Sequence, residues 1–144
     1  MGLFDSKTKV EPQFNAQKGV MTIVIAAIAA DGQASDAELS RMRSMCARSP
    51  IFSSNSKEED DAVVDFALNV WQQLGEDAIK KAAAALKPEL RETAFAFATE
   101  MIMADGIVGG EEEVFLNKLL QTLGLTEELG RAVIQVTMIR ARGV

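Results

Sequence analysis

The sequence predicts an all-α protein: a compact seven-helix bundle that contains two pseudo-repeated helix–turn–helix units. Three observations support this fold class. Apolar residues recur at helical spacing in seven segments. Ser-x-x-Glu capping boxes precede two of these segments, and no run of alternating β-branched residues indicates a strand. The 144 residues suffice for one domain with one sizeable core.

The predicted elements follow one another with short breaks. We expect a flexible arm over residues 1–14, because this stretch is polar and contains Pro12, and a helical domain over residues 15–144. The seven helices are expected at about residues 15–30, 35–49, 57–74, 76–86, 88–104, 111–123 and 126–140.

The ends of these helices follow from particular residues. In the capping boxes at residues 35–38 and 56–59, the Ser hydroxyl accepts a hydrogen bond from a first-turn amide and the Glu reaches back. Pro88 suits the first turn of the fifth helix, because an N–H at that position has no partner within the helix. Gly75 and Gly124 are expected to end the third and sixth helices, since glycine readily leaves helical geometry.

Two helices carry apolar patterns that predict where they pack. Residues 20–30 are apolar nearly all round the helix, so the first helix is expected to be central, against the helix that ends at Asp105. The seventh helix has an apolar stripe that we expect to face the core. The stripe consists of Leu129, Ala132, Val133, Val136 and Ile139.

A turn of the same construction occurs twice in the chain. In each copy an apolar helix ends at Ala-Asp-Gly, an apolar residue stands two positions after the Gly, and a Glu stands seven after the Asp. The copies are residues 30–38 and 104–112, and their offset is constant because 105 − 31 and 112 − 38 both equal 74. If the two units pack as a pseudo-symmetric pair, their turns converge and several carboxylates share one patch.

The turns carry more carboxylates than helix capping needs. Carboxylates held close together attract a cation, and the Asp-Gly with its later Glu resembles the second half of an EF-hand calcium loop. The ligands of the first half are missing, so waters would complete the shell. We predict one or two sites for calcium, magnesium or manganese, with oxygen ligands only. The predicted ligands are Asp31, Asp36, Glu38, Asp105, Glu111 and Glu112.

A purely structural interpretation of the same carboxylates stays open. Asp-Gly after a helix is a stop signal by itself, and Glu38 is explained by its capping box. Residues 111–113 stand where a helix N-terminus attracts negative charge. The sequence alone therefore allows these residues to be either metal ligands or helix caps.

The composition excludes several classes of function. The chain has no His and one cysteine, Cys46, which rules out triads that use histidine and thiolate zinc clusters. We expect Cys46 to pack as a small apolar residue. The net charge of −6 and the dispersed basic residues argue against binding to nucleic acid. Residues 20–30, the longest apolar run, are too few to span a bilayer, and residues 1–10 contain no secretory signal.

At its two turns the chain resembles the TerB-like tellurite-resistance family, which includes the N-terminal region of the membrane co-chaperone DjlA. The shared pattern is the helix ending in Ala-Asp-Gly with the later apolar residue and Glu, present here in residues 30–38 and 104–112. The resemblance covers about residues 15–140. The loop at residues 49–56 and the pair Gly109-Gly110 have no counterpart that we can map onto the family.

The resemblance implies a cytoplasmic protein of a tellurite-resistance and stress-response system that acts at the inner face of the membrane. It implies an acidic metal-binding surface and protein partners, some of them membrane-bound, and no known catalytic activity. We therefore expect a non-catalytic metal-binding and interaction module. Two alternatives remain: a metal-dependent hydrolase that uses the clustered carboxylates to activate water, and a structural scaffold without a ligand.

Overall fold

The computed structural model describes residues 12–30, 32, 34–104 and 108–143. Within these residues the chain forms seven α-helices and no strand, which confirms the all-α class. The described helices include none long and apolar enough to cross a membrane. The helices are α1 (Ala16–Ala29), α2 (Asp36–Ala47), α3 (Lys57–Leu74), α4 (Glu76–Ala84), α5 (Pro88–Ile102), α6 (Gly110–Thr122) and α7 (Glu127–Ala141).

The helix boundaries agree closely with the predicted ones. Both capping boxes are present: Ser35 Oγ accepts from Glu38 N at 3.1 Å, and Ser56 Oγ accepts from Glu59 N at 3.1 Å. Helix α4 ends at Ala84, two residues before its predicted end. The chain tightens there, because Leu86 N donates to Ala83 O at 3.1 Å, three residues back, and not to Ala82 O, four residues back. The pseudo-repeat of the two helix–turn–helix units and the domain boundary at residue 15 stay predictions.

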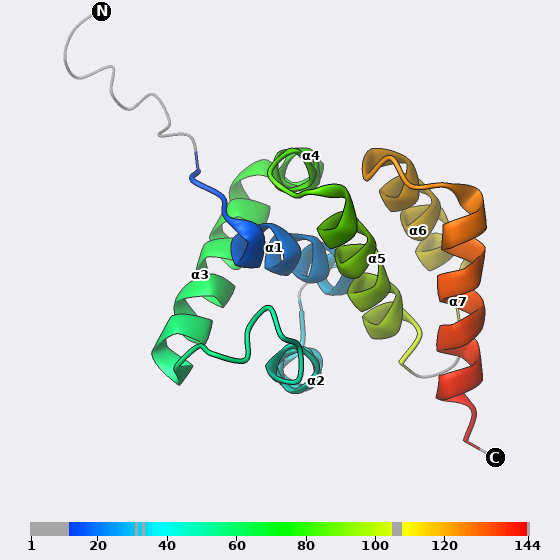
Figure 1. The fold of residues 1–144 in the computed structure, drawn as a ribbon, viewed down its shortest axis with the longest axis horizontal. Helices are drawn as coiled ribbons and strands as arrows, with labels where there is room; N and C mark the ends of the chain where they lie inside the picture. The colour runs from blue at the N-terminus through cyan, green and yellow to red at the C-terminus, as the bar shows by residue number, and fades with distance from the viewer. Residues whose placement is uncertain (1–11, 31, 33, 105–107, 144) are drawn as a thin grey trace, which may run out of the picture.

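The helix α1 is the centre of the molecule. Eleven of its fourteen residues are buried. In Figure 1 it lies between α3 and α5, with α4 above it and α2 below, and its most extensive packing is with α5 and α3. The prediction that the helices leading to the two turns pack against each other is therefore confirmed for α1 and α5.

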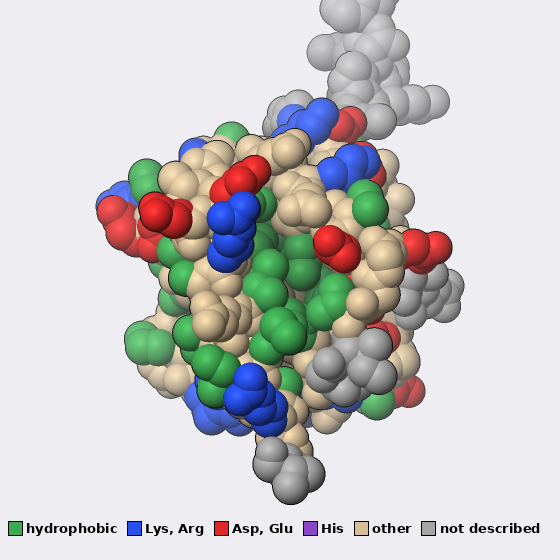
Figure 2. Space-filling model, turned by 90° about the vertical axis from the view of Figure 1, so that its right-hand side faces the viewer, with side chains coloured by type: hydrophobic (Ala, Val, Ile, Leu, Met, Phe, Trp, Pro, Cys, Tyr) green, Lys and Arg blue, Asp and Glu red, His purple; other side chains and the backbone are tan. Residues whose placement is uncertain are grey.

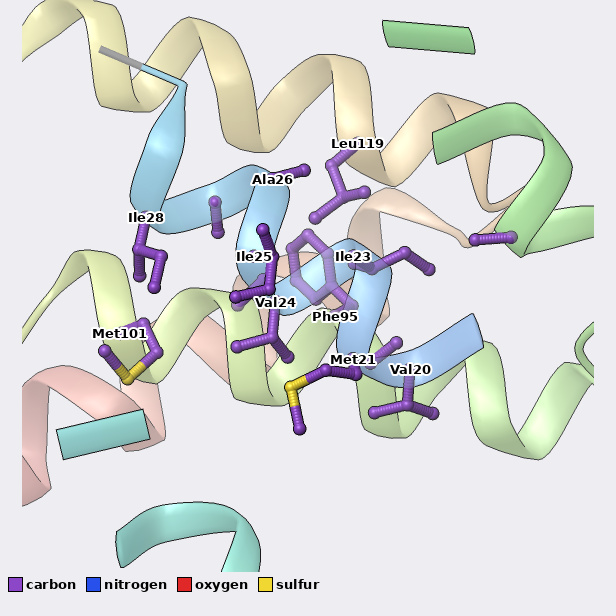
Figure 3. Close-up of a cluster of buried hydrophobic side chains, with 14 of the residues drawn as sticks. Val20, Met21, Ile23, Val24, Ile25, Ala26, Ile28, Phe95, Met101 and Leu119 are labelled. Carbon is purple, nitrogen blue, oxygen red and sulfur yellow. The ribbon is translucent and has the colours of Figure 1, made fainter. Parts of the chain in front are cut away.

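One layer of the core is formed by side chains of α1, α5 and α6. Figure 3 shows Ile23 and Ile25 of α1 beside the ring of Phe95 from α5 and the side chain of Leu119 from α6. These four side chains are between 0% and 2% exposed. Burying each such side chain contributes about 1.5–3 kcal/mol, so this layer adds substantially to the stability of the fold.

Helix α4 approaches α1 closely at Gly19. A Cβ atom at this position would lie 2.8 Å from Leu86 Cδ2 and 3.3 Å from the backbone oxygen of Ala82. Because glycine has no side chain, α4 can close the upper side of α1 at this distance. The contact keeps Ala82 and Leu86 buried.

Helix α7 differs from its prediction. The stripe predicted to face the core is wrong in its outer part: Val136 is 55% exposed, Ile139 is 49% exposed and Ala132 is exposed as well. Val133 packs against the core with Ile134, and Gly130 is the one buried residue of the helix. Figure 2 shows hydrophobic side chains across the middle of the α7 side of the molecule. An apolar stripe on a helix predicts a neighbouring element that covers it. Among the described residues, no element covers the outer face of the α7 stripe.

Candidate functional site

Residues that flank the two turns line one pocket. Helices α1 and α5 end at its edge, and α2 and α6 begin there, so residues from four helices line it. Its volume is about 670 Å³. The convergence predicted for the turns is therefore present in the described residues that flank them. Asp31 and Asp105 themselves lie outside the described residues.

The floor of the pocket is apolar. It is formed by the last turns of α1 and α5, with Ala27, Ile28, Met101 and Ile102, and Phe115 of α6 adds an aromatic wall. The four floor residues are at most 9% exposed, so only part of each reaches the pocket. A floor of this kind offers contact area for an apolar group, which a site for a bare ion does not require.

Three carboxylates line the pocket from opposite sides. Glu38 comes from the first turn of α2, and Glu111 and Glu112 come from the first turn of α6. Glu38 and Glu112 are half-buried, whereas Glu111 is exposed. The residues at 38 and at 111–112 are more than 70 positions apart in the sequence, so their proximity is a product of the fold.

Two of these carboxylates also cap helices. Glu38 Oε1 accepts a hydrogen bond from Ser35 N at 2.9 Å, and Glu112 Oε1 accepts one from Gly109 N at 2.9 Å. Glu112 thus makes the same backward bond as Glu38, although its N-cap residue is a glycine without a hydroxyl. Each cap uses one carboxylate oxygen, and no other hydrogen bond to either group occurs in the described part of the chain. Capping and ligand binding are compatible at both residues.

Arg41 is a member of the pocket that the sequence interpretation missed. It lies one turn after Glu38 on α2, and it is exposed and forms no ion pair with the described residues. It also lines a smaller neighbouring pocket of about 240 Å³, together with the end of α5 and with Thr137 and Arg140 of α7. A guanidinium beside three carboxylates lowers the negative potential of the pocket. No local pattern in the sequence distinguishes Arg41 from other surface arginines.

The predicted ligands divide into three groups. Glu38, Glu111 and Glu112 line the pocket. Asp36 is exposed in the first turn of α2 and is not among the lining residues, whereas Asp31 and Asp105 lie outside the described residues. In the described ranges, no group of three or more Cys, Asp or Glu side chains is arranged to hold a metal ion. The six-residue metal site therefore stays a prediction, with its two aspartates undescribed.

Cys46 is packed in the core, as expected. It is 4% exposed, and burial raises the pKa of its thiol from 9.0 to about 12, with smaller contributions from the negative charges of Asp60 and Glu100. The nucleophilic form of cysteine is the thiolate, which this environment disfavours. The residue is therefore a structural one, and it contributes no thiol to the pocket.

Fold and pocket together define a class: an all-α domain in which two helix–turn–helix units meet at a pocket lined by carboxylates. The family described as "Tellurite resistance protein TerB" matches residues 17–133. The chain belongs to this family. The matched range begins in α1, includes both turns and ends inside α7. Comparison with curated proteins and with solved structures gives no match.

Proposed function

We propose that this protein is a non-catalytic interaction module of a tellurite-resistance or stress-response system, and that the pocket between its turns binds a divalent cation. One observation carries the proposal: Glu38, Glu111 and Glu112, from two turns far apart in the sequence, line a single pocket. Like charges brought together in this way repel each other unless a cation neutralises them. The match to the TerB family supports a role in tellurite resistance.

The chemistry of the ligands favours calcium, magnesium or manganese. All candidate ligands are carboxylate oxygens, because the chain has no His and its Cys46 is buried away from the pocket. Hard cations prefer oxygen ligands, whereas zinc prefers nitrogen and sulfur. Three protein carboxylates leave several coordination positions for water, so the affinity is modest. Asp31 and Asp105 would add to the same site.

The lining of the pocket favours binding over catalysis. Its described residues offer carboxylates, one guanidinium and apolar groups, and no hydroxyl, thiol or amine that acts as a nucleophile. The apolar floor beside the charges suits a protein side chain, as in an adaptor that takes up a partner when the metal is bound. Partners at the inner face of the membrane fit the family and belong to the same proposal.

Thermal melting with added metal tests the site. Calcium, magnesium or manganese at millimolar concentration should raise the melting temperature, because a ligand that binds only the folded state stabilises it by RT ln(1 + [L]/Kd). Glu38→Gln together with Glu111→Gln should abolish this rise. Glutamine keeps the capping function at position 38, so the metal-free variant should melt near the natural protein.

A matched control is available at two helix starts. Glu58→Gln with Glu113→Gln removes two charges from the first turns of α3 and α6, at residues that are not predicted ligands and do not line the pocket. This control should keep the metal-induced rise. An unchanged melting temperature of the natural protein with all three metals would contradict the cation site and favour a scaffold. Turnover of a phosphate ester that requires the metal and Glu111 would instead support the hydrolase.

A further inference from the structure

The exposed stripe of α7 has the spacing of a helix–helix seam. Its residues recur at intervals of three, four and three positions, which is the spacing of the a and d core positions of a coiled coil. They are Leu129, Ala132, Val136 and Ile139. Leu129 is half-buried, and the other three are exposed. We call these four residues the α7 seam. Its last two members lie beyond residue 133, where the match to the family ends.

We propose that the α7 seam is the contact surface of a symmetric homodimer, in which α7 of one copy packs antiparallel against α7 of a second copy. A soluble domain leaves large apolar side chains exposed in a row at sites of association. The described part of the chain provides no element to cover this row. The proposal concerns a surface away from the pocket and does not depend on metal binding.

The charges at the two ends of α7 indicate a second copy of this chain as the partner. Glu128 stands in the first turn and Arg142 caps the last, and neither forms an ion pair within the described residues. They are 142 − 128 = 14 positions apart, close to four helical turns, so both flank the seam on the same side. In an antiparallel pair each Glu128 faces the partner's Arg142, and the relation holds twice because the interface is isologous.

The other charges of α7 already have partners in their own chain. Arg131 Nη2 lies 3.4 Å from Glu127 Oε2, and Arg140 Nη1 lies 3.7 Å from Glu100 Oε1. A parallel arrangement would place Glu128 beside Glu128 and would align the helix dipoles in the same direction, which is unfavourable. In the antiparallel arrangement the two helix dipoles run in opposite directions, and each Glu128 faces the Arg142 of the other copy.

The size of the α7 seam limits the expected affinity of the dimer. Helix α7 has 15 residues, so two such helices make a contact near or below the lower limit of about 1,200 Å² for stable complexes. The dimer should therefore be weak, with a dissociation constant on the order of micromolar or above. Sedimentation equilibrium of the full chain over a concentration series up to about millimolar should show a reversible monomer–dimer equilibrium.

One pair of variants separates the seam from general surface hydrophobicity. Val136→Glu places a charge in the seam and should weaken dimerisation about tenfold or more, because the carboxylate is desolvated without a partner. Val114→Glu is the matched control: Val114 lies on α6 and is 59% exposed, compared with 55% for Val136. It should leave the equilibrium unchanged. Equal weakening by both variants, or none by Val136→Glu, overturns the proposal.

Charge reversal tests the orientation and the identity of the partner. Glu128→Arg alone and Arg142→Glu alone should each weaken the dimer, since each places like charges opposite one another. The double variant carries both reversals and should regain the natural dissociation constant, because each copy again offers complementary ends. A double variant weaker than either single one overturns the antiparallel pairing. A natural protein that stays monomeric throughout the series overturns the dimer itself.

Discussion

Helices α1 and α7 have nearly the same length, 14 and 15 residues, and both are rich in apolar residues, but their surroundings are opposite. Eleven residues of α1 are buried and one residue of α7 is. Three helices pack extensively on α1, whereas the main neighbour of α7 is α5 (Figure 1). Helix α1 is apolar nearly all round and is covered by several neighbours, whereas α7 has a single apolar stripe that is covered only in part. The comparison shows that the width of the apolar face matches the number of covered sides.

The largest expected effect comes from removing one isoleucine in each helix. Ile25→Ala in α1 should lower the free energy of unfolding by about 2–5 kcal/mol, because Ile25 is fully buried and a cavity remains. Ile139→Ala in α7 should change it by less than about 0.5 kcal/mol, since this side chain is half exposed. Urea denaturation at low protein concentration measures both. Equal losses would show that α7 is as well packed as α1.

The buried thiol of Cys46, on α2, gives a chemical test of how well the core is packed. The folded pKa of Cys46 is raised to about 12 from 9.0, so above pH 9 the unfolded state releases this proton and the folded state keeps it. Stability should therefore fall by roughly 1 kcal/mol per pH unit between about pH 9 and pH 12, compared with a Cys46→Ala variant. Denaturation of both proteins across this range measures the difference.

Alkylation compares this buried thiol with an exposed one on α7. In the Cys46→Ala background, Ala132→Cys places a thiol on the outer face of α7. At a low protein concentration, where the chain is monomeric, this thiol should react with iodoacetamide as readily as a free cysteine. Cys46 in the natural protein should react only as fast as the protein unfolds. Rapid alkylation of Cys46 under native conditions would contradict its burial in the core.

Contrasting effects are expected from the two glycines that allow close helix contacts. Gly19→Ala should destabilise the fold by about 1–3 kcal/mol, because its Cβ would meet the buried Leu86 at 2.8 Å. At Gly130 the nearest atoms are the two terminal methyl groups of Leu120, both at 3.0 Å. These can shift, and alanine gains about 1 kcal/mol of helix propensity, so Gly130→Ala should be neutral or slightly stabilising. Thermal melting distinguishes the two outcomes.

Local signals in the sequence predicted the helices well. The capping boxes at Ser35 and Ser56 and the break at Gly75 act within a few residues, so their geometry is encoded where they stand. The apolar stripe of α7 was predicted to face the core, which is right for Val133 and wrong for Ala132, Val136 and Ile139. Periodicity shows that a helix has an apolar face and does not show whether the covering partner belongs to the same chain.

The pocket was predictable only in part. The repeated Asp-Gly and Glu pattern correctly brought Glu38 and residues 111–112 to one place, because each turn follows one of two helices that pack together. The same pattern treats Asp36 and Glu38 alike, although only Glu38 lines the pocket. Arg41 was missed because its role depends on a pocket wall contributed by α5 and α6, which no nearby residue signals.

The central position of α1 also has a consequence for the newly made chain. The most apolar helix is complete at Ala29, but α5, which covers one of its sides, ends at Ile102. At a synthesis rate of roughly 5–20 residues per second, the intervening segment takes roughly 4–15 s to emerge. Throughout that interval α1 has to leave the ribosome with an uncovered apolar side, so aggregation during synthesis should depend on the first helix and on how soon the fifth one arrives.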